Sequence, residues 1–297
     1  MFVAHFAPVE GPLHVFTLSE FLTAPLFATL IGASSVIGRP SLWSAWVRGL
    51  ALVGLGLWLE SVPSQISVVL VWLGILTWLT WLLVRLPSAV LLVLAGGLLL
   101  VAPMLQTAYA ADASSRLVSI IFTHPDYRLT AFVPFACLGI VLARWKAHWA
   151  RVWVWLLVPA VALYLLNVAA AFSLDPYTGT LQEILFEFCL AGAVLCLVGS
   201  MARALPGILT APVAALGAMA LTAYVGQVVI AGRYAAASPT GTDDSWALLF
   251  AMVLGWMGLA WGWSRLFAGA HGGFRRGPLE GLVALVAAPA QILRNRT

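Results

Sequence analysis

Long apolar runs alternate with short polar breaks along the whole chain. Most of the runs hold about 20 residues, the length at which an α-helix crosses the hydrocarbon core of a bilayer. The breaks between them carry proline, glycine or charge, which end helices. The pattern therefore predicts an all-α fold, a polytopic membrane helix bundle with about nine transmembrane helices, at residues 17–37, 43–60, 65–85, 88–106, 129–144, 151–172, 182–201, 211–232 and 246–267.

Composition supports the same class of protein. Of the 297 residues, 62% are hydrophobic and 9% are charged. A soluble domain of this length cannot bury so much apolar surface. We expect one integral membrane domain over residues 1–297, with 268–297 as a cytoplasmic tail. The net charge of +4 reflects basic loops between spans and gives no reason to expect a nucleic-acid partner; the lipid bilayer is the expected partner.

The basic residues predict the orientation in the membrane, because Lys and Arg concentrate in cytoplasmic loops. If the loop at residues 144–151 is cytoplasmic, twelve of the 15 basic residues lie inside, and Arg116, Arg128 and Arg233 lie outside. Ten of the 11 acids then lie at or near the outer face, with Glu280 inside. The predicted integral membrane protein has its N-terminal end outside and its C-terminus in the cytoplasm.

The opening stretch MFVAHFAPVEGPLHVF, residues 1–16, contains no basic residue. It lacks the form of a cleavable signal peptide, although the predicted orientation needs it translocated. We interpret it as the outer end of a first helix whose beginning is missing from this sequence, which would give ten spans. A short tail translocated by the first complete span is the alternative.

Two histidines near the start of the chain are candidate catalytic groups. His5 and His14 flank a loop that leads into Glu20. A histidine oriented by a carboxylate is a common general base or transient acyl acceptor. The alternative is an interfacial histidine bonded to water or to a backbone carbonyl group.

A second candidate group combines acids with arginines. Glu183 and Glu187 are four residues apart, on one face of the predicted helix at 182–201. Two such carboxylates need a cation, a shared proton or water. Arg128 and Arg233 are the predicted outer arginines at span ends, so one of them is the expected partner. These four residues predict a substrate-binding group, with an ion pair that fastens helices together as the alternative.

Other polar or reactive residues predict packing. Cys137, Cys189 and Cys196 all fall within predicted spans and lack metal-ligand spacing, so we expect them to pack in the bundle and predict no metal site. Gln227 and Asn167 lie inside spans, where such side chains hydrogen-bond across helices.

Five segments resemble a known family and occur in its order. They are LTAPLFATLIGASS (22–35), RGLALVGLGLWLE (48–60), RLTAFVPFACLGIVLAR (128–144), ALTAYVGQ (220–227) and GFRRGPLEGL (273–282). Together they resemble the bacterial relatives of heparan-alpha-glucosaminide N-acetyltransferase, within the transmembrane acyltransferase superfamily. The resemblance implies transfer of an acyl group, such as acetyl, from cytoplasmic acyl-CoA to an extracytoplasmic glycan or lipid acceptor in a bacterial plasma membrane.

The resemblance also implies site residues. His14 matches the catalytic histidine of the family across a gap, His5 matches a polar residue, and Glu20 matches an acid before the second helix. The family's opening Asp-x-x-Arg-Gly segment is absent. Residues 177–180 read Tyr-Thr-Gly-Thr where many bacterial relatives have His-Ser-Gly-Thr.

The expected co-substrate is acetyl-CoA or another acyl-CoA, with no permanently bound cofactor. Arg144, Lys146 and Arg151 are candidates for holding the phosphate groups of CoA, while positive-inside bias is the alternative explanation of their charge. Two other functions stay open, a transporter or permease for a small solute or lipid and a non-catalytic membrane scaffold. The sequence does not indicate an oligomeric state.

Overall fold

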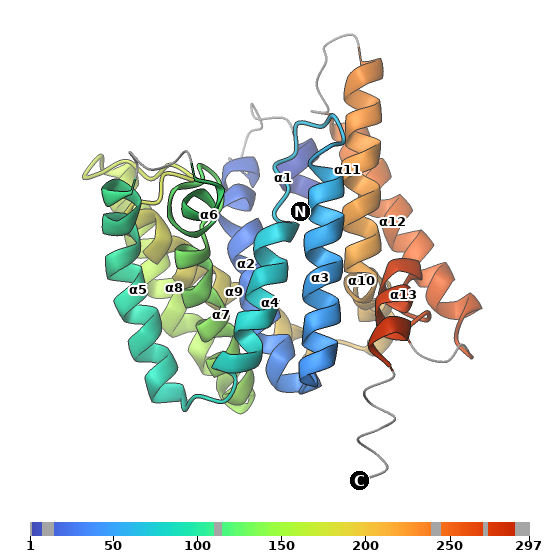
Figure 1. Cartoon of the computed structure of the whole chain (residues 1–297), viewed down its shortest axis with the longest axis horizontal. Coiled ribbons are helices and arrows are strands. Elements are labelled where there is room, and N and C mark those ends of the chain that lie inside the picture. Colours follow the sequence, from blue (N-terminus) through green and yellow to red (C-terminus); the bar gives the residue numbers. More distant parts are fainter. Residues whose placement is uncertain (1, 8–14, 110–114, 239–244, 270–272, 289–297) are drawn as a thin grey trace. The chain divides into compact units, whose positions relative to one another are not determined.

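The computed structural model describes the chain except for residues 1, 8–14, 110–114, 239–244, 270–272 and 289–297 (Figure 1). The described residues form helices joined by turns and loops. The helices are α1 (Phe2–Phe6), α2 (Val15–Gly38), α3 (Leu42–Leu59), α4 (Leu70–Leu83), α5 (Ser88–Ala108), α6 (Arg116–Val118), the π-helix η2 (Ser119–Thr123), α7 (Leu129–Arg144), the 3-10 helix η3 (Lys146–His148), α8 (Trp149–Val168), α9 (Leu181–Ala204), α10 (Gly207–Ala218), α11 (Ala220–Ala237), α12 (Trp246–Leu266) and α13 (Pro278–Ala287). The all-α prediction is confirmed at this level.

Among the described residues, six helices are long and apolar enough to cross a membrane, and a seventh span results if α10 and α11 count as one. The chain is therefore an integral membrane protein with six to seven candidate spans. Two of the predicted spans, 65–85 and 129–144, correspond to the shorter helices α4 and α7, of 14 and 16 residues. At 1.5 Å per residue they extend about 21 and 24 Å, less than the ~30 Å hydrocarbon core. Nine spans are thus not shown.

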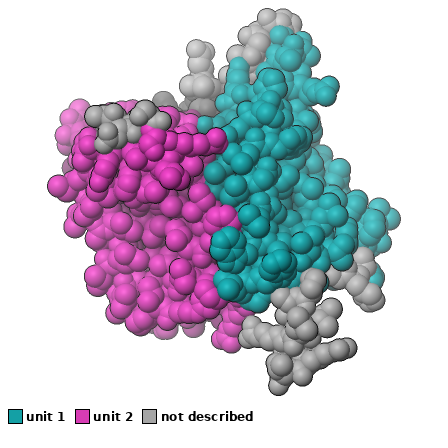
Figure 2. Space-filling view, viewed as in Figure 1, with its two compact units in different colours: residues 1–19, 41–71, 204–297 teal, residues 20–40, 72–203 magenta. Residues whose placement is uncertain are grey.

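Contacts within the chain divide it into two compact units (Figure 2), which we describe separately. Unit 1 comprises residues 1–19, 41–71 and 204–297, and unit 2 comprises residues 20–40 and 72–203. The prediction of a single membrane domain over residues 1–297 stays a prediction.

Helix α7 forms the core of unit 2, and most of its side chains are buried. Two glycines allow α2 to approach it closely. A Cβ atom on Gly32 would overlap the carbonyl group of Ala136, and one on Gly139 would overlap that of Thr29. Such small residues are typical of helix contacts in membranes, where close backbone approach gives van der Waals attraction.

The cysteines belong to this packed interior. Cys137 and Cys196 are free and fully buried in two hydrophobic clusters. Cys189 packs against a third cluster, next to Phe186. Their predicted packing role is confirmed.

Unit 1 contains a broken helix where the sequence predicts one continuous span at 211–232. Helices α10 and α11 meet at Met219 with a bend of 69°. The carboxylate of Glu280 stabilises the break, because its Oε1 accepts hydrogen bonds from the amide N–H groups of Leu221 (2.7 Å) and Thr222 (3.0 Å). Its Oε2 accepts one from the Thr222 hydroxyl group at 2.6 Å. An acid at a helix N-terminus satisfies amides that the bend would leave unpaired.

The cytoplasmic tail at 268–297 stays a prediction, and helix α13 within it packs against α3 and α11. Two further predictions need correction. The side-chain oxygen of Asn167 accepts a hydrogen bond from the Leu174 amide at 2.9 Å, so it closes the loop after α8 and does not join helices. Gln227 is fully buried, and its carboxamide has no hydrogen-bond partner within the described part of the chain, contrary to the expected interhelical bond.

Candidate functional site

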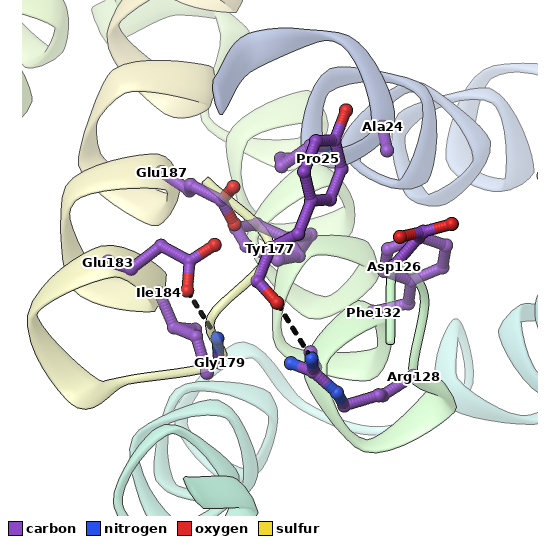
Figure 3. Close-up of a pocket in the computed structure, with 12 residues that line it drawn as sticks. Ala24, Pro25, Asp126, Arg128, Phe132, Tyr177, Gly179, Glu183, Ile184 and Glu187 are labelled. Carbon is purple, nitrogen blue, oxygen red and sulfur yellow. Dashed lines mark hydrogen bonds between the residues drawn. The ribbon is translucent and has the colours of Figure 1, made fainter. Parts of the chain in front are cut away.

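A small cavity that contains several charged side chains lies in unit 2, where α7 and α9 begin (Figure 3). Its volume is about 20 Å³, enough for roughly one water molecule. Helix α2 contributes Pro25 to its wall. The polar side chains that line it are Asp126, Arg128, Tyr177, Glu183 and Glu187, and we call this site the acidic cavity.

The first acid of the cavity is held by the loop before α9. Glu183 is 2% exposed, and its Oε2 accepts hydrogen bonds from the Thr178 hydroxyl group at 2.7 Å and from the Gly179 amide. Its own amide donates to the Thr180 hydroxyl group at 3.4 Å. This resembles a capping box, in which an acid three residues into a helix binds backbone amides at the helix start. Glu183 is therefore fixed in position.

Glu187 lies one turn further along α9 and is held less firmly. Its side chain is 9% exposed. Within the described part of the chain its carboxyl group makes no hydrogen bond, and it interacts through charge with Glu183 and Arg128. A buried carboxyl group without such a bond is costly to keep. Glu187 is consequently the cavity's most available acceptor for a ligand's donor group.

Arg128 provides the positive charge of the acidic cavity. Its Nε donates to the His124 carbonyl group at 2.9 Å, and its Nη2 donates to the carbonyl groups of Pro125 (2.7 Å) and Tyr177 (2.9 Å). Burial lowers the pKa of Arg128, while the neighbouring carboxylates, Glu183 first, act in the opposite direction. The guanidinium group thus links the loop before α7 to the loop before α9 by hydrogen bonds, and it interacts electrostatically with the acids of the cavity.

The structure distinguishes the two arginines that were candidate partners for the glutamates. Arg128 lines the same cavity as Glu183 and Glu187. Arg233 is an exposed residue of α11 and belongs to unit 1. Arg128 is therefore the arginine brought together with the glutamates.

Tyr177 lines the acidic cavity together with its acids. Its φ angle of 66° is in the left-handed region, which is unfavourable for a bulky side chain. Burial raises the pKa of Tyr177, and so do the charges of four acids on three segments, Glu20, Glu187, Asp126 and Glu183. The phenol therefore stays neutral and can donate a hydrogen bond. Since Glu20 acts on Tyr177, the predicted acid of α2 lies near the acidic cavity.

The predicted catalytic histidines are not brought together with this cavity by the described residues. His14 lies outside the described residues. His5 belongs to α1 in unit 1, whereas Glu20 belongs to unit 2. Burial lowers the pKa of His5 to about 3, so its ring is neutral at physiological pH. The grouping of His14, His5 and Glu20 stays a prediction.

The basic residues proposed for CoA differ in their surroundings. Arg144 is bound to backbone, since its guanidinium group donates to the carbonyl groups of Val84 (2.6 Å) and Leu86 (2.8 Å) and to the Ser88 hydroxyl group (3.2 Å). These bonds close the turn between α4 and α5. Lys146 and Arg151 are exposed. A CoA-binding role for the three residues stays a prediction.

Sequence reasoning missed the loop that holds Glu183. Thr178 and Gly179 bind the carboxylate, and Tyr177 lines the same cavity. The signal was present in the spacing Thr180-Leu-Gln-Glu183, which matches a capping box. Among the described residues, no group of three or more His, Cys, Asp or Glu side chains could hold a metal ion.

The helices and the acidic cavity define an integral membrane protein with a buried acidic site. The chain belongs to a family described as a protein of unknown function (DUF418), whose model matches residues 138–288. This match includes Tyr177, Glu183 and Glu187, and it also includes the broken helix pair α10–α11. Comparisons with curated proteins and with solved structures gave no match. The resemblance to the N-acetyltransferase relatives stays a prediction.

Proposed function

We propose that this protein is a membrane acyltransferase, which moves an acyl group such as acetyl from cytoplasmic acyl-CoA to a glycan or lipid acceptor on the other face. The observation that carries the proposal is the cavity that Tyr177 and Arg128 line together with three acids, Asp126, Glu183 and Glu187. The charge of Glu20 also acts on Tyr177. Helix α7 begins at this acidic cavity and ends at Arg144, about 24 Å away. The acidic cavity and one of the candidate CoA-binding residues therefore lie at opposite ends of α7.

The chemistry of acyl transfer matches the groups in the cavity. The acceptor is an amine or a hydroxyl group, and it must lose a proton as it attacks the thioester. Glu187 can accept a hydrogen bond from the acceptor, because it makes none within the described residues. Tyr177 can donate to the oxygen of the thioester carbonyl, where negative charge develops in the transition state. Glu183 stays in place to fix the loop that carries Tyr177.

The reaction then balances as follows. The nitrogen or oxygen of the acceptor forms a bond to the acyl carbon, and the carbon–sulfur bond of acyl-CoA breaks. The base that removes the acceptor proton is His14, or His5 in its place, and Glu20 orients the imidazole. The proton ends on the departing CoA sulfur.

A thiol-release assay tests the proposal. The purified full chain, reconstituted in vesicles, is given acetyl-CoA and either an amino sugar or a hydroxyl-bearing lipid, and free CoA thiol is measured. His14→Ala should lower the rate about 100-fold or more, the usual contribution of a positioned proton-transfer group. Glu187→Gln should lower it about tenfold, because the amide oxygen accepts a hydrogen bond without the charge of the carboxylate. Glu60→Gln is the matched control, since Glu60 is an exposed residue at the end of α3 in unit 1. Turnover of both variants at the wild-type rate contradicts the assignment.

Proton-coupled transport of a small solute or lipid is a second candidate. It is favoured by the broken pair α10–α11, since interrupted helices are common in transporters, and by the buried Glu187. Flux in vesicles should then depend on a pH gradient and consume no acyl-CoA. Solute flux that is unchanged when the gradient is collapsed rejects this candidate.

A further inference from the structure

Unit 1 places three arginines close to the start of α13. Arg48 lies on α3, and Arg275 and Arg276 lie directly before α13, which packs against α3. Because α13 packs against α3, Arg276 and Arg48 lie on neighbouring segments, and the positive charge of Arg276 acts on that of Arg48. Like charges at close range raise the free energy of the folded protein unless an anion lies between them.

These arginines have no partner of their own in the described part of the chain. None of their three guanidinium groups makes a hydrogen bond or an ion pair there. Arg144 and Arg128 contrast with them, since each donates three hydrogen bonds. The charge at Arg48, Arg275 and Arg276 is therefore available to a ligand.

The acid of this segment does not neutralise them. Glu280 follows Arg276 by four residues, but both of its carboxylate oxygens are engaged at the start of α11. Oε1 accepts two amide N–H groups and Oε2 accepts the Thr222 hydroxyl group. With Glu280 so occupied, the surface that bears the arginines keeps a net positive charge.

The surroundings of the arginines are typical of a membrane surface. Trp46 and Leu50 on α3 and Leu282 on α13 are about half exposed (46%, 56% and 51%). Trp43 joins the two helices, because its Nε1 donates to the Val286 carbonyl group at 3.3 Å. Tryptophan beside arginine is characteristic of the boundary between hydrocarbon and headgroups. This combination of side chains favours a position for the arginines at the membrane surface.

We propose that Arg48, Arg275 and Arg276 form a binding site for a phosphate-bearing ligand at the membrane surface. Guanidinium groups match phosphate oxygens with paired, charge-assisted hydrogen bonds. The phosphate belongs to an anionic lipid headgroup or to acyl-CoA. The acyl-CoA source rests on the proposed function, whereas the site itself does not.

Direct binding measurements on the full chain in neutral detergent test the site. The lipid probe is phosphatidylglycerol, compared with phosphate-free diacylglycerol, and bound lipid is counted by native mass spectrometry. The cofactor probe is coenzyme A, compared with pantetheine, which lacks the phosphates, and its affinity is measured by calorimetry. Arg48→Gln and Arg276→Gln should each weaken the bound phosphate ligand about fivefold to tenfold, and the double variant about 25-fold or more.

Arg265→Gln is the matched control. Arg265 is an exposed arginine of the same unit that lies over the Trp261 ring at 4.9 Å, so its loss removes the same charge elsewhere. Its effect should stay within about twofold. Unchanged melting temperature and elution volume show that each variant is folded.

The results separate this inference from the proposed function. Weaker binding of either probe by the double variant, beyond that of Arg265→Gln, supports the site and identifies its ligand. In another outcome, coenzyme A binds equally well to the wild type and the double variant, and lipid binding does not depend on the arginines either. This result overturns the site and leaves the proposed function intact. Arginine-dependent lipid binding with no coenzyme A binding by the wild type supports the site and counts against acyl-CoA as co-substrate. Binding of neither probe overturns the site.

Discussion

Gly179→Ala tests how the acidic cavity is held together. Gly179 has a φ angle of +71°, which an L-residue with a Cβ atom rarely adopts. A Cβ atom there would overlap Gln106 Oε1 and the guanidinium group of Arg128. Since Arg128 is tied to the Tyr177 carbonyl group at 2.9 Å, the added methyl group must displace that bond. One small substitution should therefore disturb both loops of the cavity.

The expected loss follows from two contributions. The left-handed conformation costs an alanine about 1–2 kcal/mol relative to glycine. Loss of the charged hydrogen bond from Arg128 to Tyr177 costs about 1.5–3 kcal/mol. The free energy of unfolding should fall by about 2.5–5 kcal/mol, a large part of the ~5–15 kcal/mol that stabilises a typical protein.

Reversible unfolding by sodium dodecyl sulfate in mixed micelles, followed by circular dichroism, measures this loss. Gly96→Ala is the matched control, because Gly96 lies inside α5 with nothing within 4 Å of an added Cβ atom. There the higher helix propensity of alanine should raise stability by about 1 kcal/mol or less. If Gly179→Ala is as stable as the wild type, or both variants lose the same amount, the account of the cavity is wrong.

Three further predictions concern single side chains. Burial and the surrounding carboxylates raise the pKa of Tyr177, so the folded state keeps a proton that the unfolded state releases above about pH 10. The unfolding free energy of the wild type should therefore fall as the pH rises above about 10. A pH series of unfolding curves should show that this part of the fall is missing in Tyr177→Phe. Glu280→Gln should lose about 1 kcal/mol or more of unfolding free energy, because the amide carries no charge for the α11 N-terminus, and an unchanged unfolding midpoint would contradict the capping role. Arg144→Gln should lower the free energy of unfolding by about 2–3 kcal/mol, because it loses its hydrogen bonds at the α4–α5 turn. Lys146→Gln should change the free energy of unfolding by about 0.5 kcal/mol or less. Equal losses in the same unfolding assay would refute the structural role of Arg144.

The helices could be predicted from the sequence because apolar runs and helix breakers are local signals. Helix α9 at Leu181–Ala204 contains the predicted run 182–201, and α5 at Ser88–Ala108 contains 88–106. Helix lengths were harder, since the predicted span at 65–85 shortens to Leu70–Leu83. There the preceding loop packs on α11 instead, with the Val69 amide donating to the Tyr224 hydroxyl group at 3.3 Å. A tertiary contact of this kind leaves no trace in hydropathy.

The break at Met219 was invisible for a similar reason. Hydropathy averages over the bend, and the stabilising carboxylate of Glu280 lies about 60 residues further along the chain. Only the folded chain brings that acid to the start of α11. The interruption of this helix could therefore not be predicted from the sequence.

The candidate site was predictable in part. Spacing and the scarcity of outer arginines predicted Arg128 or Arg233 as the partner of Glu183 and Glu187. The structure selects Arg128, which lines one cavity with both glutamates. The roles of Tyr177 and Gly179 depend on backbone conformations with positive φ angles, which the sequence does not specify for a tyrosine. The effect of the Glu20 charge on the pKa of Tyr177 likewise depends on how α2 packs against the loop before α9.

Sidedness tests the central claim most directly, since the proposed transfer needs the acidic cavity and the far end of α7 on opposite faces of the membrane. Single cysteines replace exposed Asp175, in the loop of the cavity, and exposed Lys146, beyond the end of α7, in a chain whose own three cysteines are changed to alanine. Intact cells are treated with a thiol reagent that does not cross membranes. We predict labelling at position 175 and protection at position 146 until the cells are lysed; labelling of both positions in intact cells, or of position 146 alone, would contradict the account.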